Sequence, residues 1–211
     1  MNKGVITGDL VNSTNIAAEW RQTIVNSLKA CVADFESITP VRLEMYRGDS
    51  FQIVVDDAEQ TLAVAIALRA KLKASTPENS DIWDARVSVG IGTISFESDS
   101  IVTSDGEAFR LSGRAFDAIG KKGLNISTPW AEVNDAIALV TRFADEFVSS
   151  WTERQAKVVY HSLLFPKTQK DMADDLGMSR QNFNFHWRAS NAQLILDYIT
   201  YFKKLLAQHN Q

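Results

Sequence analysis

The alternation of apolar and polar residues predicts a set of short strands in the first part of the chain. These strands fall at residues 4–10, 41–46, 51–55, 86–96 and 124–127. Only a tight turn at Gly48-Asp49 separates the second strand from the third, so we expect the two to form a hairpin. Gly90 and Gly92 lie within the fourth strand and indicate that another backbone segment approaches closely there.

Apolar residues spaced by three or four positions predict helices between these strands. The helices fall at residues 17–35, 58–74, 106–119 and 130–148. The resulting order is βαββαβαβα, and its βαββαβ core predicts a ferredoxin-like or palm-like sheet with helices on one face. We therefore expect an α+β fold.

The pattern also predicts how the chain is divided. We expect an α/β domain at residues 1–129, a connecting helix at 130–150 and an all-α helix-turn-helix module at 151–211. The composition agrees with an ordinary globular protein, since 45% of the residues are hydrophobic and 23% are charged.

Composition also bears on location. The apolar stretches are too short to cross a bilayer, and the first residues lack the basic and then apolar layout of a secretion signal. These features predict a cytoplasmic protein that does not enter a membrane. The single cysteine, Cys31, excludes an internal disulfide, and its apolar neighbours favour a buried side chain.

Charge is distributed unevenly along the chain. Residues 1–150 carry 14 basic and 21 acidic side chains, whereas residues 151–211 carry 8 basic and 5 acidic ones. An acidic first part is compatible with metal or nucleotide binding, and a mildly basic second part is compatible with phosphate contact.

Two aspartates are predicted to meet at one edge of the sheet. Asp9 ends the first strand, and the crossover helix returns the chain so that the hairpin turn containing Asp49 lies at the same edge. Two carboxylates suit Mg²⁺, which takes oxygen ligands from one or two carboxylates and completes its shell with water and substrate phosphates. The alternative is that Asp9 caps the following loop and that Asp49 serves the tight turn.

Short motifs carry a resemblance to known families. Residues 8–14 (GDLVNST) and 47–52 (RGDSFQ), with residues 87–92, resemble the SatD family of bacterial proteins across essentially the whole chain. The N-terminal part is also similar to class III nucleotidyl cyclases. This second resemblance implies that Asp9, Asp49 and the backbone carbonyl of Leu10 hold Mg²⁺ or Mn²⁺ for chemistry on a nucleoside triphosphate.

Residues 106–114 are similar to the cyclase segment in which an asparagine and an arginine stabilise the transition state. Arg114 matches that arginine, and Arg110 falls at the asparagine position. Their spacing of four residues places both guanidinium groups on one helix face, where they suit a phosphate. The alternative is a solvated pair that forms salt bridges with nearby acids. Met45 and Thr103 fall near the positions that recognise the purine base in such cyclases, where a lysine and a polar partner are usual. The identity of the base is therefore not predicted.

The most specific signal is a helix-turn-helix in the C-terminal part. Thr152 caps a helix that stops before Pro166, and Thr168 caps a short helix at 169–176. Gly177 then makes the tight turn, and Ser179 caps a third helix that begins at residue 180.

Polar residues of the third helix are expected to face outward, because Phe183 and Trp187 share its buried face. The outward residues are Ser179, Arg180, Gln181, Asn184 and Arg188. Arg, Gln and Asn side chains read guanine and adenine edges in the major groove, so this face predicts binding of double-stranded DNA. The alternative is a helical module used for packing or dimerisation.

A last helix at 194–206 has a wide apolar face that must be covered. It can pack on the N-terminal domain or on a second copy of the chain. A homodimer would suit both a reader of DNA half-sites and a cyclase-like site shared between protomers.

Three functions are therefore predicted as alternatives. The first is a DNA-binding regulator whose palm-like domain binds Mg²⁺ and a nucleotide as the sensed ligand, with the helix at 130–148 transmitting that state. The second is an enzyme, a nucleotidyl cyclase or related nucleotidyltransferase, in which Asp9 and Asp49 bind metal and Arg114 stabilises charge. The third is a structural protein with neither activity.

Overall fold

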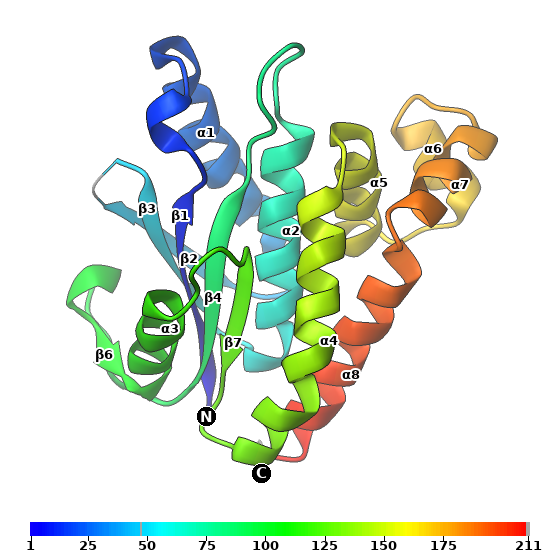
Figure 1. The fold of residues 1–211 in the computed structure, drawn as a ribbon. Coiled ribbons are helices and arrows are strands. Elements are labelled where there is room, and N and C mark those ends of the chain that lie inside the picture. The colour runs from blue at the N-terminus through cyan, green and yellow to red at the C-terminus, as the bar shows by residue number, and fades with distance from the viewer. Residues whose placement is uncertain (47, 210–211) are drawn as a thin grey trace.

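The computed structural model describes residues 1–46 and 48–209, and it has a five-stranded sheet beside a thick layer of helices (Figure 1). The strands are β1 Lys3–Leu10, β2 Val41–Tyr46, β3 Ser50–Val55, β4 Ala85–Gly92 and β7 Leu124–Ser127. Their order in the sheet is β2-β3-β1-β4-β7. All neighbours pair antiparallel except β4 and β7, which are parallel. The α+β class is thus confirmed. Arg47, in the expected hairpin turn, lies outside the described residues.

Each predicted helix is found close to its expected bounds. The helices are α1 Ala18–Phe35, α2 Thr61–Ala74, α3 Glu107–Asp117, α4 Ala131–Ser150, α5 Glu153–Leu164, α6 Gln169–Asp175, α7 Arg180–Ala189 and α8 Ala192–Ala207. Three short 3-10 turns complete the set, at η1 Ser13–Asn15, η2 Ala58–Gln60 and η3 Ile101–Thr103. Among the described residues, no helix has the length and apolar character needed to span a membrane.

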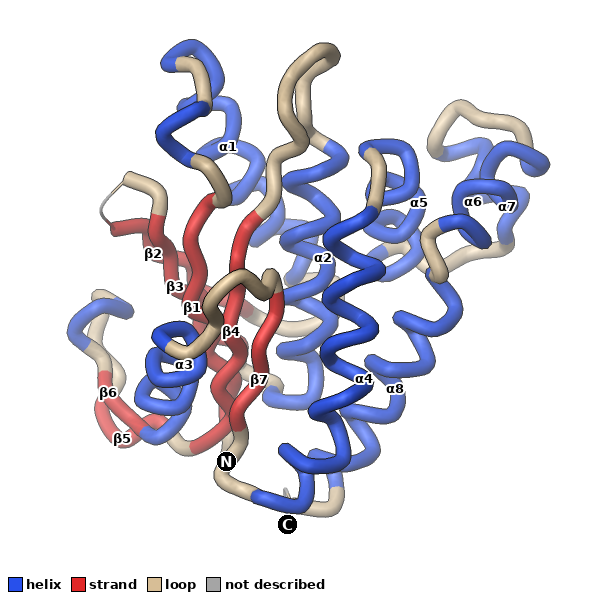
Figure 2. Tube along the Cα trace, in the orientation of Figure 1, coloured by secondary structure: helices blue, strands red, loops and turns tan. Residues whose placement is uncertain are grey.

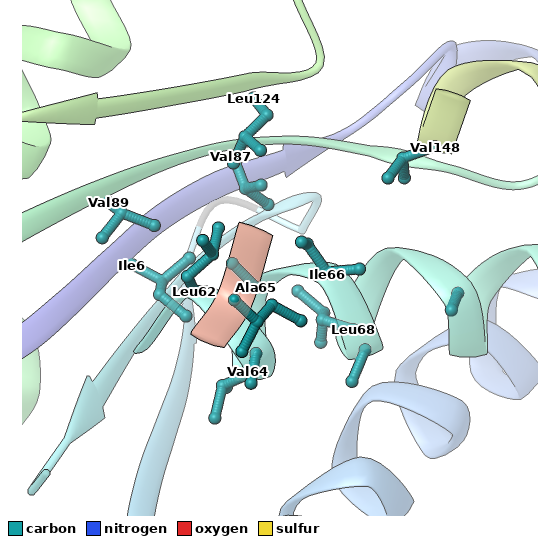
Figure 3. Close-up of a cluster of buried hydrophobic side chains, with 14 of the residues drawn as sticks. Ile6, Leu62, Val64, Ala65, Ile66, Leu68, Val87, Val89, Leu124 and Val148 are labelled. Atoms are coloured by element: carbon teal, nitrogen blue, oxygen red, sulfur yellow. The ribbon is translucent and has the colours of Figure 1, made fainter. Parts of the chain in front are cut away.

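The main hydrophobic core surrounds α2. Nearly all of this helix is buried, as expected of one that lies inside a protein, and it contacts the sheet together with α1, α4, α5 and α8. Figure 3 shows Leu62 and Ile66 of α2 among the side chains of Ile6, Val87 and Val89 from the sheet. Cys31 of α1 is fully buried in this core, as predicted.

The opposite face of the sheet is covered by α3, so the expectation that helices lie on one face only is wrong (Figures 1 and 2). The two glycines of β4 give the physical reason. A Cβ atom at Gly90 would lie 2.2 Å from the carbonyl oxygen of Ala108 and 2.4 Å from the amide nitrogen of Ser112. The close backbone approach predicted for this strand is therefore made by α3.

The predicted strand at 86–96 is divided in two. β4 ends at Gly92, and β5 Ile94–Phe96 pairs instead with β6 Asp105–Gly106 in a separate two-stranded sheet. The chain leaves the main sheet at Thr93, whose carbonyl accepts a hydrogen bond of 3.3 Å from the amide of Ala108 in the first turn of α3. The Thr93 carbonyl thus accepts a hydrogen bond from α3, whereas in a continuous strand it would be available to a neighbouring strand.

The C-terminal helices are not all separate from the sheet. α5 packs on α2, and α8 packs on α4 and η2, so buried residues of both helices join the main core. α6 and α7 differ, because their buried residues Met172, Ala173 and Phe183 form a small cluster with Val158 of α5. Figure 1 shows this α6–α7 unit at one end of the helical layer. The domain boundaries at 129 and 150 remain a prediction.

Candidate functional site

The two predicted aspartates lie at the same edge of the sheet. Asp9 faces Ser50 in the antiparallel pairing of β1 with β3, and the Leu10 amide donates a 3.0 Å hydrogen bond to the carbonyl of Asp49. Pairing of the strands therefore sets this proximity, although forty residues separate the two aspartates. The placement follows the sequence prediction, whereas the role of the two side chains is still a prediction.

The Asp9 carboxylate is held by a guanidinium group that the sequence analysis missed. Arg86 Nε donates to one carboxylate oxygen at 3.0 Å, and Nη2 donates to the other at 2.5 Å. Arg86 also donates to the Gly120 carbonyl at 3.2 Å and lies 5.9 Å from the Phe116 ring centre. The hydrogen bond with Asp9 raises the pKa of Arg86, so its guanidinium group stays charged. This contact follows from the register of β1 with β4, in which Asp9 and Arg86 are direct cross-strand neighbours.

Asp49 borders a cavity on the other side of the same edge. The Ser13 hydroxyl donates a 2.7 Å hydrogen bond to the Asp49 carboxylate, which joins the loop after β1 to the hairpin turn. The cavity measures about 210 Å³. Its lining comprises Leu10, Ser13, Thr14, Ile16, Arg21, Ile24, Val25, Gly48 and Asp49. Hydroxyl groups, one arginine and an apolar wall therefore surround a volume suited to part of a phosphorylated ligand.

The donor set fits a divalent cation only in part. Strand pairing brings Asp9, Asp49 and the Leu10 main chain to one edge. Among residues 1–46 and 48–209, however, there is no cluster of three or more His, Cys, Asp or Glu side chains that could hold a metal. Both oxygens of Asp9 are also engaged by Arg86. A metal ion at Asp9 would have to displace that guanidinium, whereas Asp49 keeps one oxygen with weaker contacts.

Arg110 and Arg114 share the outer face of α3, as their spacing predicts, and both are exposed. Arg110 forms a salt bridge of 3.0 Å with Asp105, near the start of the helix. Arg86 and Asp9 lie toward its other end, beside Phe116. The side of α3 that faces the sheet presents Ser112, not an arginine. The structure therefore directs both arginines to solvent and does not bring them onto Asp9 within one chain.

The caps and the turn predicted around α6 and α7 are present, whereas the helix-turn-helix itself stays a prediction. Thr168 accepts from the amide of Asp171 at 3.2 Å, and Ser179 accepts from the amide of Asn182 at 3.1 Å, so both helices are capped. Gly177 adopts a φ of 65°, the left-handed conformation that glycine favours in such a turn. These three residues fix the path of the chain between α6 and α7.

The predicted reading face of α7 is open. Phe183 is fully buried and stacks on Trp187 at 6.1 Å between ring centres. On the other side, four of the five predicted DNA contacts are exposed and the fifth, Asn184, is half-buried. The exposed four are Ser179, Arg180, Gln181 and Arg188. Phe185, also exposed, adds a large apolar side chain that sequence analysis had not singled out.

Acidic side chains of α6, which packs against α7, reduce the net positive charge around the predicted reading face. Asp171 and Asp174 are exposed, and Asp175 binds Lys167 at 2.8 Å and His161 at 3.1 Å. The hydrogen bond from Lys167 lowers the pKa of Asp175. The basic residues of α7 are therefore presented beside a partly neutralised acidic helix.

A buried charge cluster joins the edge of the sheet to α4. Arg69 of α2 is only 1% exposed, and it binds Asp84 at 2.7 Å and Asp145 of α4 at 2.8 Å. Lys73, also buried, binds Asp84 at 3.1 Å. The carbonyl of Asp84 in turn accepts a 2.9 Å hydrogen bond from the Val11 amide, in the loop that follows Asp9. The cluster thus contacts both the aspartate edge and the long helix that leads to α5.

Comparison with known proteins gives partial structural overlaps. A GGEEF domain of a diguanylate cyclase from Vibrio cholerae overlaps at a TM-score of 0.42 and 15% identity, over 60% of this chain and 83% of that one. A bacterial light-regulated adenylyl cyclase overlaps at 0.39 and 10%, over 60% and 75%. A regulator of polyketide synthase expression from Bifidobacterium adolescentis overlaps at 0.26 and 11%, over 97% and 85%.

No family model and no curated protein matches the chain. The resemblance to the SatD family therefore stays a prediction. Roles of individual residues in this protein rest on the contacts within the chain itself.

Proposed function

We propose that this protein is a cytoplasmic DNA-binding regulator whose sheet domain binds a nucleotide, with Mg²⁺ as the accompanying cation. The observation that carries the proposal is the open polar face of α7, held above a buried aromatic side. Arg180 and Gln181 lie at the start of this helix, which is the part that enters the major groove in helix-turn-helix proteins. Because acidic residues of α6 lie nearby, we expect modest affinity that falls with added salt.

The nucleotide part of the proposal rests on the cavity beside Asp49. Hydroxyl groups of Ser13 and Thr14 and the guanidinium of Arg21 supply donors for a phosphate, and the apolar wall can take a ring. Asp49 would hold the cation, with Asp9 as a second ligand once Arg86 has moved. When bound, the cation would neutralise and orient the phosphates.

We propose binding in preference to turnover because of two contacts. Arg86 occupies both oxygens of Asp9, and Arg110 is directed toward Asp105 on the outside of α3. A nucleotidyltransferase of this chain would need both groups rearranged.

Communication between the two parts has a physical route. Val11 follows the aspartate edge and binds Asp84, which binds Arg69, and Arg69 binds Asp145 of α4. Further along the chain, the Trp151 indole donates a 2.8 Å hydrogen bond to the Ser190 carbonyl at the end of α7. Contiguity of this kind supports the proposal, and double-mutant coupling is its test.

The DNA proposal is tested by selecting bound duplexes from a random pool and measuring affinity by fluorescence anisotropy. If Arg180 contacts a base edge, Arg180→Ala should cost about 1–3 kcal/mol on the selected site and relax its specificity. Lys29→Ala, at an exposed position of α1, is the matched control and should bind as the wild type does. Failure of the pool to enrich any sequence would contradict the regulator.

The nucleotide proposal is tested by thermal unfolding with each ribonucleoside triphosphate, with and without Mg²⁺. We expect stabilisation by one or more of them that needs the metal and is lost in the Asp9→Ala, Asp49→Ala double variant. Arg86→Gln frees the Asp9 carboxylate, so binding of Mn²⁺ alone, followed by electron paramagnetic resonance, should tighten. An unchanged Mn²⁺ affinity would exclude Asp9 as a ligand, and no shift with any nucleotide would reject the site.

A further inference from the structure

The helical layer carries a concentrated apolar surface on its outer side. Five of the ten large hydrophobic side chains that are exposed among the described residues lie on α4 and α8. They are Leu139, Val140, Phe143, Leu194 and Tyr201, and we refer to them as the α4–α8 face. All of them except Leu139 border a groove of about 460 Å³ between the two helices, whose other lining includes Phe147 and Ile195. Contiguous apolar surface of this kind marks an interaction site.

Contacts beneath the α4–α8 face hold its two helices in place. The Thr141 and Tyr198 hydroxyls share a buried hydrogen bond of 2.5 Å that joins the two helices below the groove. Burial of Ala144 and Ile195 in the main core holds the same two helices from beneath. The face is therefore a preformed surface, not one that must order on binding.

The outward row of α8 indicates what covers this face. Leu194, Asp197, Tyr201, Lys204 and Ala207 follow one another at spacings of three and four residues, and all five are exposed. Asp197 and Lys204 lie on either side of Tyr201, each at the same distance along the helix from the midpoint of the row. The row begins with a large apolar residue, Leu194, and ends with a small one, Ala207.

This row is complementary to itself under a two-fold axis. If two copies of α8 run antiparallel, Asp197 of each meets Lys204 of the other, and Leu194 of each fits over Ala207 of the other. The charge pattern and the size pattern require the same register. An acidic and a basic residue in one row also argue against an anionic membrane surface or a nucleic acid, because both are negatively charged.

We infer that the α4–α8 face pairs with the same face of a second copy of this chain, through antiparallel α8 helices and symmetric Asp197–Lys204 contacts. The inference does not need DNA binding, but it fits it. In this register the N-terminal ends of the two α8 helices lie about 25 Å apart, from the rise of 1.5 Å per residue. Each α7 lies at the N-terminal end of its α8 (Figure 1), so the two α7 helices lie at opposite ends of the pair, as two readers of DNA half-sites would.

The test is the mass of the full chain in solution without DNA, measured by sedimentation equilibrium over a wide range of concentration. Asp197→Lys and Lys204→Asp each create two like-charge contacts per dimer and should weaken self-association by about tenfold or more. The variant that carries both changes restores opposite charges and should recover the wild-type dimer. Lys29→Asp, an equal change of charge on α1, is the control and should have no effect.

Each outcome decides the proposal. A wild type that is monomeric at every concentration would overturn it and assign the face to another protein. Single variants that dimerise normally would place any dimer on a different surface. Weakening without recovery in the double variant would reject the antiparallel register. Circular dichroism melts of all four variants, whose changed residues are exposed, confirm that each chain is folded, and none of these results depends on a DNA site.

Discussion

α2 and α7 are each the central helix of their part of the molecule, yet they are held very differently. Twelve of the 14 residues of α2 are buried, whereas α7 buries only Phe183 among its ten residues. α2 is enclosed by the sheet and four helices, whereas the α6–α7 unit has its own small cluster at the end of the layer and meets the main core through Trp187. We therefore expect local opening of α6 and α7 at a cost well below that of unfolding the sheet.

The largest effect on stability is expected at Arg69, the only arginine of the enclosed helix α2. Arg69→Ala would leave Asp84 and Asp145 without their main partner in the core, and breaking a buried charge cluster in this way costs about 3–5 kcal/mol. Urea denaturation followed by circular dichroism measures the loss. Arg114→Ala, at an exposed arginine, should stay within about 0.5 kcal/mol of the wild type. Equal stability of the two variants would contradict the enclosed character of α2.

The smaller cluster is tested at Phe183. Phe183→Ala should remove about 3 kcal/mol of packing from the α6–α7 unit. Hydrogen exchange followed by mass spectrometry should then show faster exchange in residues 169–189, with the protection of β1 and β4 kept. Phe185→Ala, at a phenylalanine that is 66% exposed, is the matched control. Loss of protection throughout the chain would mean that the two regions unfold together.

The close packing of α3 on the sheet gives a prediction of intermediate size. Gly90→Ala places a methyl group against the α3 backbone and should destabilise the protein by about 1–3 kcal/mol, as overpacking does. Gly113→Ala in the same helix meets no atom within 4 Å and should raise stability by up to about 1 kcal/mol. Thermal unfolding compares the two, and the same sign for both would contradict the position of α3.

The smallest effect is expected at Cys31, within the main core. Burial raises the pKa of its thiol to about 12, so the native protein should resist a thiol reagent at mildly alkaline pH and react fully once unfolded. Because the folded pKa is the higher one, the stability that the buried thiol contributes is complete below its ordinary value of 9.0 and is lost as the pH rises toward 12. Rapid labelling of folded protein would contradict the burial.

Features with a local cause could be predicted from the sequence. The caps at Thr168 and Ser179 need only neighbouring amides, and the glycines of β4 need only the absence of a side chain. The proximity of Asp9 and Asp49 followed from connectivity alone. The alternation of apolar residues gave the strands of the main sheet, although it could not show where the fourth leaves that sheet.

Features that depend on register across the sheet could not be predicted. Arg86 lies in a strand whose alignment with β1 is set by the packing of both faces, and its pairing with Asp9 spans 77 residues. The position of α3 depends on which face the crossover chooses, and the same apolar pattern suits either. Arg69 sits within an apolar run, where its charge gave no sign of partners 15 and 76 residues away.

The Arg69 cluster also constrains how such a chain can change over time. Arg69 and Lys73 balance Asp84 and Asp145, so substitution of any one of them leaves an excess charge inside the molecule. In diverging relatives, position 69 should therefore be replaced by an apolar residue only together with positions 84 and 145. An alignment in which these positions vary independently would show that other groups have taken over the balance of charge.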